Sequence, residues 1–442
     1  MNFRGQAGNQ HHTCPKKRAK TGQHWKACLA LVVVVLSPQL QFAVASWSGE
    51  THQTVRTRHM HDSAHLHLEV KQLAVQQEAQ KVAVVNTIGF HNEVYAALLY
   101  SFQQAGGDAE AFVELPATNN IQEVLHWYKK PFQSHKDFLP QACSYDVVVI
   151  ATFPEHHTNF LRELRDKSCE GQQLVLMVHN PDTVLTPEPG GALSPVSLMH
   201  PNDTHVLTLV PRMVVDTRAN LVSMGMHVPV SSFVPVFPVS LECSPEELAA
   251  QKDTNKDPYL CDQAERHGFV LQGLFQSHRR NYHSVFEGLA ANQELMNSSG
   301  FHLTLIGQGQ LDLPEALQGK VSIHTRLPYK AYYRYIRQAI AVLPAFASEV
   351  YYNKKSSSSV AAAVVCSTPV FANQRLLTAY PYLSKSSVYF MEDREDDVAA
   401  MLRLLAMPQA EVQAHIGALQ KAEEELFHDN ERTAAGMEGS CF

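Results

Sequence analysis

The chain has 442 residues, of which 45% are hydrophobic and 18% charged, and its formal net charge at pH 7 is -7. This composition excludes a largely disordered chain, and the length leaves room for two domains with separate hydrophobic cores. Because the balance is mildly acidic, the sequence lacks the basic surplus of nucleic-acid-binding proteins, and we expect no nucleic-acid partner.

The first 46 residues differ from the rest and predict a targeting segment. Six lysines and arginines precede the first acidic residue, Glu50, and the apolar run ACLALVVVVL occupies residues 27–36. A bilayer-spanning helix needs ~20 apolar residues, so this run suits a signal-peptide core, with a cleavage site at Ala43–Ala45. An uncleaved type II anchor, with membrane association through residues 27–46, is the open alternative. Both alternatives place residues 47–442 in the secretory pathway, either in the ER or Golgi lumen or secreted.

Residues 47–80 are polar and predict a solvated stem. Their histidines include a cluster that is an alternative candidate for metal binding: His59, His61, His65 and His67. Sequons at Asn202 and Asn297 are compatible with a glycoprotein. Six cysteines lie beyond the leader without a C-x-x-C pair, so the sequence supports no zinc site. Two of them, Cys243 and Cys261, flank a polar stretch and are candidates for a disulfide.

Between residues 81 and 241, buried strands alternate with helices. The sequence predicts helices at 91–107, 121–132 and 158–167, and strands at 81–89, 109–115, 145–153, 172–180, 205–211 and 231–239. Continuous apolar strands that alternate with helices indicate a parallel sheet covered on both faces.

Residues 242–265 are charged and contain proline, and we interpret them as an interdomain linker. The alternation then restarts with helices at 280–295, 328–339, 359–367 and 397–407, and strands at 268–275, 301–310, 320–327, 340–346, 370–372 and 386–393. The predicted fold class is therefore α/β, with two doubly wound Rossmann-like domains, 81–241 and 266–407, facing each other across a cleft. A helix and tail follow at 408–442. Ligands of such domains lie beyond the carboxyl ends of the strands.

Two of these strand ends carry candidate ligand-binding groups. Arg279 and Arg280 follow the strand 268–275 near the start of a helix, where backbone N–H groups and the helix dipole favour a phosphate. Ordinary surface charge is the alternative. Gly307 and Gly309 follow the next strand and permit a ligand to approach the backbone closely, although turns also require glycine.

A third strand end carries a lysine and serine cluster. Lys354 and Lys355 precede four serines, 356–359, and the apolar helix begins within these serines. Serine is a preferred helix N-cap, and its hydroxyl also binds oxyanions. We therefore expect the two lysines, with Ser357 and Ser358, to form the mouth of a phosphate site rather than a flexible linker.

The order of these features resembles the C-terminal half of the retaining, glycogen-synthase-like glycosyltransferases of the GT-B fold (glycosyl transferases group 1). The matching features are a strand ending at Gly273 before the basic pair, LTLIGQG, IAVLPAF, Glu349 at the opening of the serine loop, and CSTPVFA. The resemblance covers residues 267–405, and the first domain resembles the acceptor domain more loosely. The chain departs from the family's Glu-x7-Glu pattern because Ser357 stands at the second glutamate. The family's glycine before Pro369 is also replaced, by Thr368 and Ser367.

The resemblance implies a hexosyltransferase-like enzyme that moves a sugar from a nucleotide-sugar donor to a glycan, lipid or protein acceptor. Glu349 would contact the sugar, and the donor site would comprise Gly273, Arg279, Arg280, Gly307, Gly309, Lys354, Lys355, Ser357 and Ser358. Its positive groups would stabilise the leaving nucleotide electrostatically without a metal or other cofactor, which agrees with the lack of an Asp-x-Asp motif.

Histidines follow two strands of the first domain. His179, and similarly His91, are candidates for proton transfer or for orienting the acceptor, with a purely structural role as the alternative. Two further functions are compatible with the same fold: a non-catalytic glycan-binding or scaffold protein, and a nucleotide-sugar epimerase. Turnover that requires an acceptor would indicate a transferase, turnover without one an epimerase, and binding without turnover a scaffold.

Overall fold

The computed structural model describes residues 79–153, 158–167, 169–185, 195–247, 266–298, 301–392 and 394–438. The leader, the stem with its histidine cluster and most of the linker lie outside these residues, so the predictions about them stay predictions. Within the described part of the chain, no helix has the length and apolar character needed to cross a membrane.

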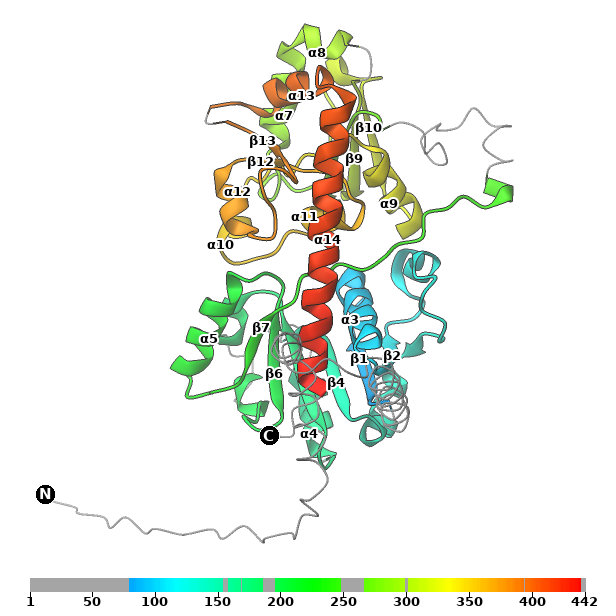
Figure 1. Ribbon diagram of the computed structural model, residues 1–442, viewed down its shortest axis with the longest axis vertical. Helices are drawn as coiled ribbons and strands as arrows, with labels where there is room; N and C mark the ends of the chain where they lie inside the picture. The colour runs from blue at the N-terminus through cyan, green and yellow to red at the C-terminus, as the bar shows by residue number, and fades with distance from the viewer. Residues whose placement is uncertain are drawn as a thin grey trace, which may run out of the picture. The chain divides into compact units, whose positions relative to one another are not determined.

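The first domain is built on a seven-stranded, entirely parallel sheet (Figure 1). The strand order is β3-β2-β1-β4-β5-β6-β7. The chain adds strands outward in one direction from β1 to β3 and in the opposite direction from β4 to β7, so the strand order reverses between β1 and β4. The strands are β1 (Lys81–Asn86), β2 (Asp108–Val113), β3 (Gln133–Ser134), β4 (Val147–Phe153), β5 (Gln173–Val178), β6 (Thr204–Thr208) and β7 (Val230–Ser232). The α-helices are α3 (Asn92–Gln104), α4 (Thr158–Asp166) and α5 (Met213–Ser223).

Burial of β1 on both faces explains its continuous apolar sequence. Val82 and Val84 belong to one hydrophobic cluster, whereas the alternate residues Ala83 and Val85 belong to another. All four are fully buried. Because side chains alternate between the faces of a strand, the sheet is covered on both sides, as the sequence predicts.

The second domain repeats this topology. Four parallel strands in the order β10-β9-β8-β11 continue through a bridge between Val342 and Val370 to the parallel pair β12 and β13. The strand order reverses between β8 and β11, and ligands of doubly wound sheets bind beside such a reversal. The strands are β8 (Phe269–Leu274), β9 (Leu303–Gln308), β10 (Val321–Thr325), β11 (Ala341–Val342), β12 (Phe371–Ala372) and β13 (Tyr389–Phe390).

Short helices connect the strands of the second domain. They are α7 (Tyr282–Ala291), α8 (Gln293–Asn297), α9 (Tyr329–Gln338), α10 (Val350–Asn353), α11 (Ser358–Val365), α12 (Gln374–Ala379) and α13 (Asp397–Leu405). The predicted single helix 280–295 is divided at Asn292, whose side chain accepts a hydrogen bond from Leu295 N and caps α8. The helices α5, α10 and α12 are additions that the sequence analysis missed.

Two other predictions in the first domain are wrong in detail. The predicted helix 121–132 is a short 3-10 helix, Thr118–Val124, followed by turns. Its apolar residues have helical spacing, but Leu125 leaves the helical conformation, with φ -103° and ψ 56°, and ends the helix. Positive φ angles at Asn119 and Asn120 kink the segment just before residue 121. The predicted strand 231–239 ends at Ser232, because Pro235 and Pro238 cannot donate to a sheet ladder.

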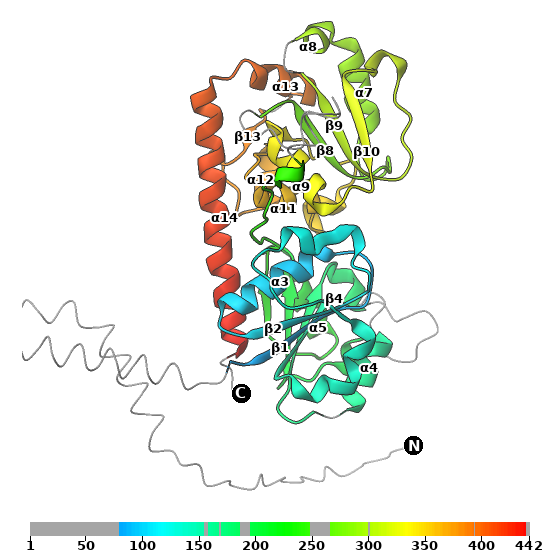
Figure 2. The ribbon, with the colours of Figure 1, turned by 90° about the vertical axis from the view of Figure 1, so that its right-hand side faces the viewer.

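The long helix α14 (Gln409–Glu438) follows the second domain and packs on both domains (Figure 2). It contacts α3 of the first domain and α11 of the second. Asn430 pairs with both backbone groups of Val234, at 3.2 Å from its N–H and 2.7 Å from its carbonyl. These two hydrogen bonds therefore hold α14 against the segment that leaves the first domain.

Cysteine pairing is partly described. Cys143 and Cys169 form a disulfide in the first domain, and Cys243 is also disulfide-bonded. Cys261, its partner on the sequence prediction, lies outside the described residues. The Cys366 thiol is buried and free.

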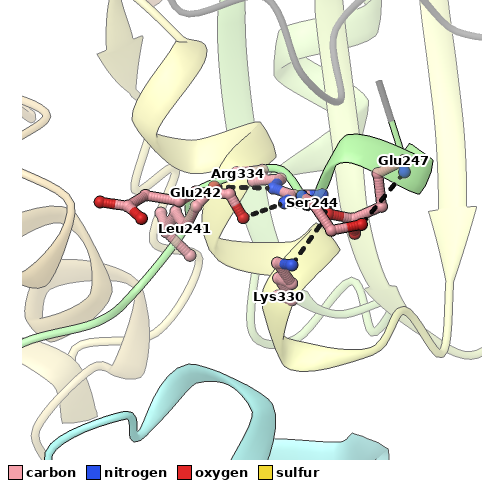
Figure 3. A network of polar contacts seen from close by, with 6 residues as sticks. All are labelled: Leu241, Glu242, Ser244, Glu247, Lys330 and Arg334. Carbon is pink, nitrogen blue, oxygen red and sulfur yellow. Dashed lines mark hydrogen bonds and ion pairs between the residues drawn. The ribbon is translucent and has the colours of Figure 1, made fainter. Parts of the chain in front are cut away.

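A polar network ties the start of the linker to α9 (Figure 3). Arg334 donates to both carboxylate oxygens of Glu247 at 3.0 Å, and also to the carbonyls of Leu241 and Glu242. Lys330 donates to Glu247 at 2.9 Å. Ser244 and Glu247 cap each other's backbone N–H groups. The hydrogen bonds from Arg334 are the main cause of a Glu247 pKa lowered to about 2.

This network predicts an acid-dependent part of the stability. Because the folded-state pKa of Glu247 is about 2, below the ordinary glutamate value of 4.5, its contribution to stability is present above pH 4.5 and disappears as the pH falls toward 2. Glu247→Gln is expected to lower the free energy of unfolding at pH 7 and to reduce the loss of stability between pH 7 and pH 4, measured by urea unfolding.

The matched control is Glu242→Gln, because Glu242 is exposed and enters the network through its carbonyl. Equal pH dependence in Glu247→Gln and the unsubstituted chain would contradict the role of this carboxylate.

Candidate donor and acceptor site

The strand ends of the second domain approach each other too closely for side chains. Gly273 and Gly307 are register partners, and a Cβ atom on Gly307 would lie 1.8 Å from the Gly273 carbonyl oxygen. Gly273 and Gly309 also have φ angles of 147° and 115°, which other residues rarely adopt. The three glycines predicted for the site thus bring bare backbone to the carboxyl edge of the sheet, next to the reversal between β8 and β11.

Arg280 lies directly under this edge and is only 3% exposed. Its guanidinium donates to the carbonyls of Gln272 and Arg279 at 3.2 Å each, and to Ser359 Oγ at 2.8 Å. The rings of Phe346 and Tyr351 stack on it, each with its centroid 5.1 Å from Cζ. The side chain is consequently fixed by polar contacts and by two aromatic rings.

The charge of Arg280 has no carboxylate counter-ion within 4.0 Å among the described residues. Burial lowers the pKa of its guanidinium. A buried charge without a counter-ion is unfavourable, and an anion bound next to it would offset that cost. Arg280 is therefore the strongest anion-binding candidate in the second domain.

The start of α11 lies beside Arg280. Ser357 is its N-cap, with Oγ accepting from Ser359 N at 3.3 Å, while the Ser357 N–H donates to the Tyr380 hydroxyl at 3.1 Å. Ser357 is 1% exposed, so its hydroxyl serves the helix, whereas Ser358 is exposed. Ser359, which the residue-level prediction missed, accepts from Arg280 and lies 2.6 Å from Gln272 Oε1. Ser359 thus links the helix start to the buried arginine.

The other charged candidates lie farther toward the surface. Lys354 forms an ion pair with Asp182 at 2.5 Å, and both side chains are about half exposed, at 51% and 47%. Lys355 and Arg279 are partly exposed. The Glu349 side chain is 69% exposed and pairs with Arg375, whose guanidinium lies 4.1 Å from the centroid of the Tyr352 ring. Only Arg280, of the predicted basic residues, is enclosed at the glycine edge.

The carboxyl edge of the first domain carries a pair of stacked histidines. The rings of His91 and His179 are 4.0 Å apart at an angle of 21°. His179 Nε2 lies 2.8 Å from the Ala151 carbonyl, which can only accept, so this nitrogen carries the proton. His91 Nδ1 lies 3.2 Å from the hydroxyl of Thr152, which donates to Asn86 at 3.3 Å. The structure brings both predicted histidines together at the reversal between β1 and β4.

Contacts between the two domains place these edges near each other. Asp182 follows His179 by three residues and pairs with Lys354 of the serine loop. Glu93, at the start of α3, accepts a hydrogen bond from the Tyr329 hydroxyl of α9 at 3.2 Å. Burial raises the pKa of Glu93. The loop after β5 and the loop before α11 are therefore neighbours in space.

One cavity of about 590 Å³ lies in the first domain near the carboxyl end of β2. Its lining is mainly apolar and includes Leu115, Leu125, Tyr128 and Phe132, with Gln122 and Lys130 as polar members. Within the described ranges, no group of three His, Cys, Asp or Glu side chains is placed to hold a metal ion.

Comparison with solved structures identifies the fold. Trehalose-6-phosphate synthase OtsA has a TM-score of 0.52 at 13% identity, over 82% of this chain and 99% of that one. A glycosyltransferase from Rickettsia africae ESF-5 gives 0.51 at 9% identity, over 82% and 100% of the two chains. The N-terminal domain of Candida albicans trehalose-6-phosphate phosphatase gives 0.51 at 8% identity, over 83% and 98%. No protein-family model and no curated protein matches the sequence. The chain therefore has the GT-B fold, with two Rossmann-like domains, as the sequence predicts.

Proposed function

We propose that the protein is a glycosyltransferase that moves a sugar from a nucleotide-sugar donor to a glycan, lipid or protein acceptor. The observation that carries the proposal is the buried Arg280 guanidinium, which lacks a carboxylate partner among the described residues and lies beside the Gly273–Gly307 edge and the start of α11. These are the groups that a diphosphate requires: a fixed cation, accessible backbone and a helix N-terminus.

In this proposal the second domain holds the donor and the first holds the acceptor. As the bond between the sugar and the diphosphate breaks, negative charge grows on the leaving phosphate, and Arg280 stabilises that charge. Lys355 adds positive potential at the entrance, next to the Lys354–Asp182 ion pair. His179 and His91 lie at the opposing edge, where an acceptor hydroxyl would be oriented.

A panel of nucleotide sugars tests this function. We expect one of them to raise the melting temperature, because binding to the native state stabilises it. Release of the nucleoside diphosphate is then measured with and without a mixture of glycan, lipid and protein acceptors. Acceptor-dependent release supports a transferase, and release or isomerisation without an acceptor supports an epimerase.

A nucleotide-sugar-binding protein without transfer activity is the second candidate. Ser357, at the position of the family's second glutamate, is buried as a helix cap. Glu349, the expected sugar contact, is paired with Arg375 at the surface. Binding without release of the nucleoside diphosphate would favour this candidate.

We expect activity to be independent of metal ions. Arginine, lysine and backbone N–H groups would neutralise the phosphates, and the sequence contains no Asp-x-Asp motif. Activity should therefore persist in EDTA at an unchanged rate. A loss of activity on chelation that manganese or magnesium restores would contradict this mechanism.

We also propose that residues 47–442 lie in the secretory pathway. The Cys143–Cys169 disulfide supports this location, because disulfides persist in oxidising compartments. Asn202 and Asn297 are both exposed, as glycosylation requires. Expression in cells is expected to give a product whose apparent mass falls on treatment with an endoglycosidase. Intact microsomes should protect this product from protease. Digestion of the C-terminus in intact microsomes would contradict the location.

A further inference from the structure

Arg212 belongs to the first domain but donates its hydrogen bonds to the second. It is the residue before α5, and its Nε lies 3.3 Å from the Asn353 carbonyl. Its Nη2 donates to the carbonyls of Tyr351, at 3.0 Å, and Lys355, at 2.7 Å. Its Nη1 donates to the carbonyl of Ala379 at 2.5 Å. One guanidinium therefore binds four backbone carbonyls of the other domain.

Two of these carbonyls lie at the ends of two short helices. Asn353 is the last residue of α10, and Ala379 is the last residue of α12. The final carbonyls of a helix lack partners within it and carry the negative end of the helix dipole, so a cation is favourable there. The five N–H donors of arginine form a planar fork that can serve several carbonyls at once, whereas a lysine ammonium is a single point of charge.

The same backbone segment builds the candidate donor site. The ring of Tyr351 stacks on Arg280, and the Tyr351 carbonyl also accepts from the Tyr380 hydroxyl at 3.0 Å. That hydroxyl accepts from the N–H of Ser357, the cap of α11, and Arg212 lies over the Tyr380 ring at 5.1 Å. Arg212 is therefore connected through one residue to the buried arginine and through another to the helix start.

We propose that Arg212 is a positioning residue that couples contact between the two domains to the order of the donor site at residues 351–357. In the domain arrangement described, the segment that carries Lys354, Lys355 and Ser357 is held by a side chain of the acceptor domain. Binding of the donor and approach of the domains then favour each other, because each stabilises the same backbone arrangement. The donor part of this inference rests on the proposed function, whereas the ordering of the segment does not.

The experiment compares Arg212→Gln and Arg212→Lys with the unsubstituted chain. Arg218→Gln is the matched control, because Arg218 lies on α5 and donates to Val230 within the first domain. Hydrogen exchange of the ligand-free proteins is measured at the amides of Lys354, Lys355 and Ser357. We expect about tenfold faster exchange at these amides in both Arg212 variants, unchanged exchange in β8, and no change in Arg218→Gln.

A second measurement is the affinity for uridine, guanosine and adenosine diphosphates by titration calorimetry. We expect Arg212→Gln to bind the preferred diphosphate about tenfold more weakly, with Arg212→Lys intermediate. A general loss of structure would speed exchange in β8 as well, and Arg212→Lys retains the charge if Arg212→Gln does not fold.

The two proposals fail in different ways. Unchanged exchange at 351–357 in both variants would overturn the ordering role of Arg212. Faster exchange with unchanged diphosphate affinity would overturn the coupling to the donor site. If the unsubstituted chain binds none of the three diphosphates, the proposed function and the coupling fail together, and the exchange rates alone then decide the ordering role.

Discussion

Arg280→Met is expected to weaken binding of the donor diphosphate by roughly ten- to a hundredfold. One charge-assisted hydrogen bond contributes about 1.5–3 kcal/mol, and each 1.4 kcal/mol changes the affinity about tenfold. The ligand-free protein should lose little stability, because the variant also removes a buried charge that lacks a carboxylate partner among the described residues. Titration calorimetry gives the affinity, and thermal unfolding gives the stability.

Arg279→Met is the matched control, since this neighbouring arginine is partly exposed. Its effect on the affinity should be at most about tenfold. A large fall in melting temperature of Arg280→Met with unchanged diphosphate affinity would show that Arg280 is only a packing residue.

Gly307→Ala is expected to be the most destabilising substitution at the site. Its Cβ would lie 1.8 Å from the Gly273 carbonyl oxygen, so β8 and β9 must separate. Overpacking typically costs about 1–3 kcal/mol, and a clash with backbone in a sheet belongs at or above the upper end of that range. Urea unfolding should show this loss, and binding of the diphosphate should weaken with it.

The control for this change is Gly417→Ala on α14. Nothing lies within 4 Å of its Cβ position, and alanine has the higher helix propensity, so the variant should be more stable by up to about 1 kcal/mol. Equal stability of Gly307→Ala and the unsubstituted chain would contradict the close strand approach described above.

Periodicity predicted most of the fold because it reports local burial. The apolar run of β1 fills two hydrophobic clusters, and such runs are visible in the sequence without knowledge of the partner strands. Prediction was weaker where apolar spacing and backbone conformation disagree. Residues 121–132 have helical spacing, but the non-helical backbone of Leu125, with φ -103° and ψ 56°, ends the helix after Val124.

The sequence predicts which strand ends carry the candidate site, but it does not predict the side-chain contacts within that site. Gly273 and Gly307 lie near the carboxyl ends of β8 and β9, and Arg280 follows β8, so their strand-end positions are visible in the sequence. The stacking of Tyr351 on Arg280, by contrast, depends on how α10 packs under the serine loop. Arg212 acts on Lys355, 143 residues away, and no local pattern signals such a contact.

The sequence places His91 and His179 at strand ends, but it does not distinguish a role in proton transfer or acceptor orientation from a structural role. Each follows a strand, and parallel topology brings the carboxyl ends of β1 and β5 to one edge. Their stacking and the carbonyl of Ala151 that fixes the protonated nitrogen of His179 are tertiary features. Asn86 and Thr152 also lie at strand ends, so the sequence could have indicated them as site residues. Together with His91 they form one hydrogen-bonded group.

Titration of the unsubstituted chain with nucleoside diphosphates and the matching nucleosides shows whether the second domain binds a donor diphosphate at Arg280. We expect one of the uridine, guanosine or adenosine diphosphates to bind one to one, and its nucleoside to bind about a hundredfold more weakly. Equal affinity for the nucleoside and the diphosphate, or no binding of any of the three diphosphates, would contradict a donor-diphosphate site at Arg280.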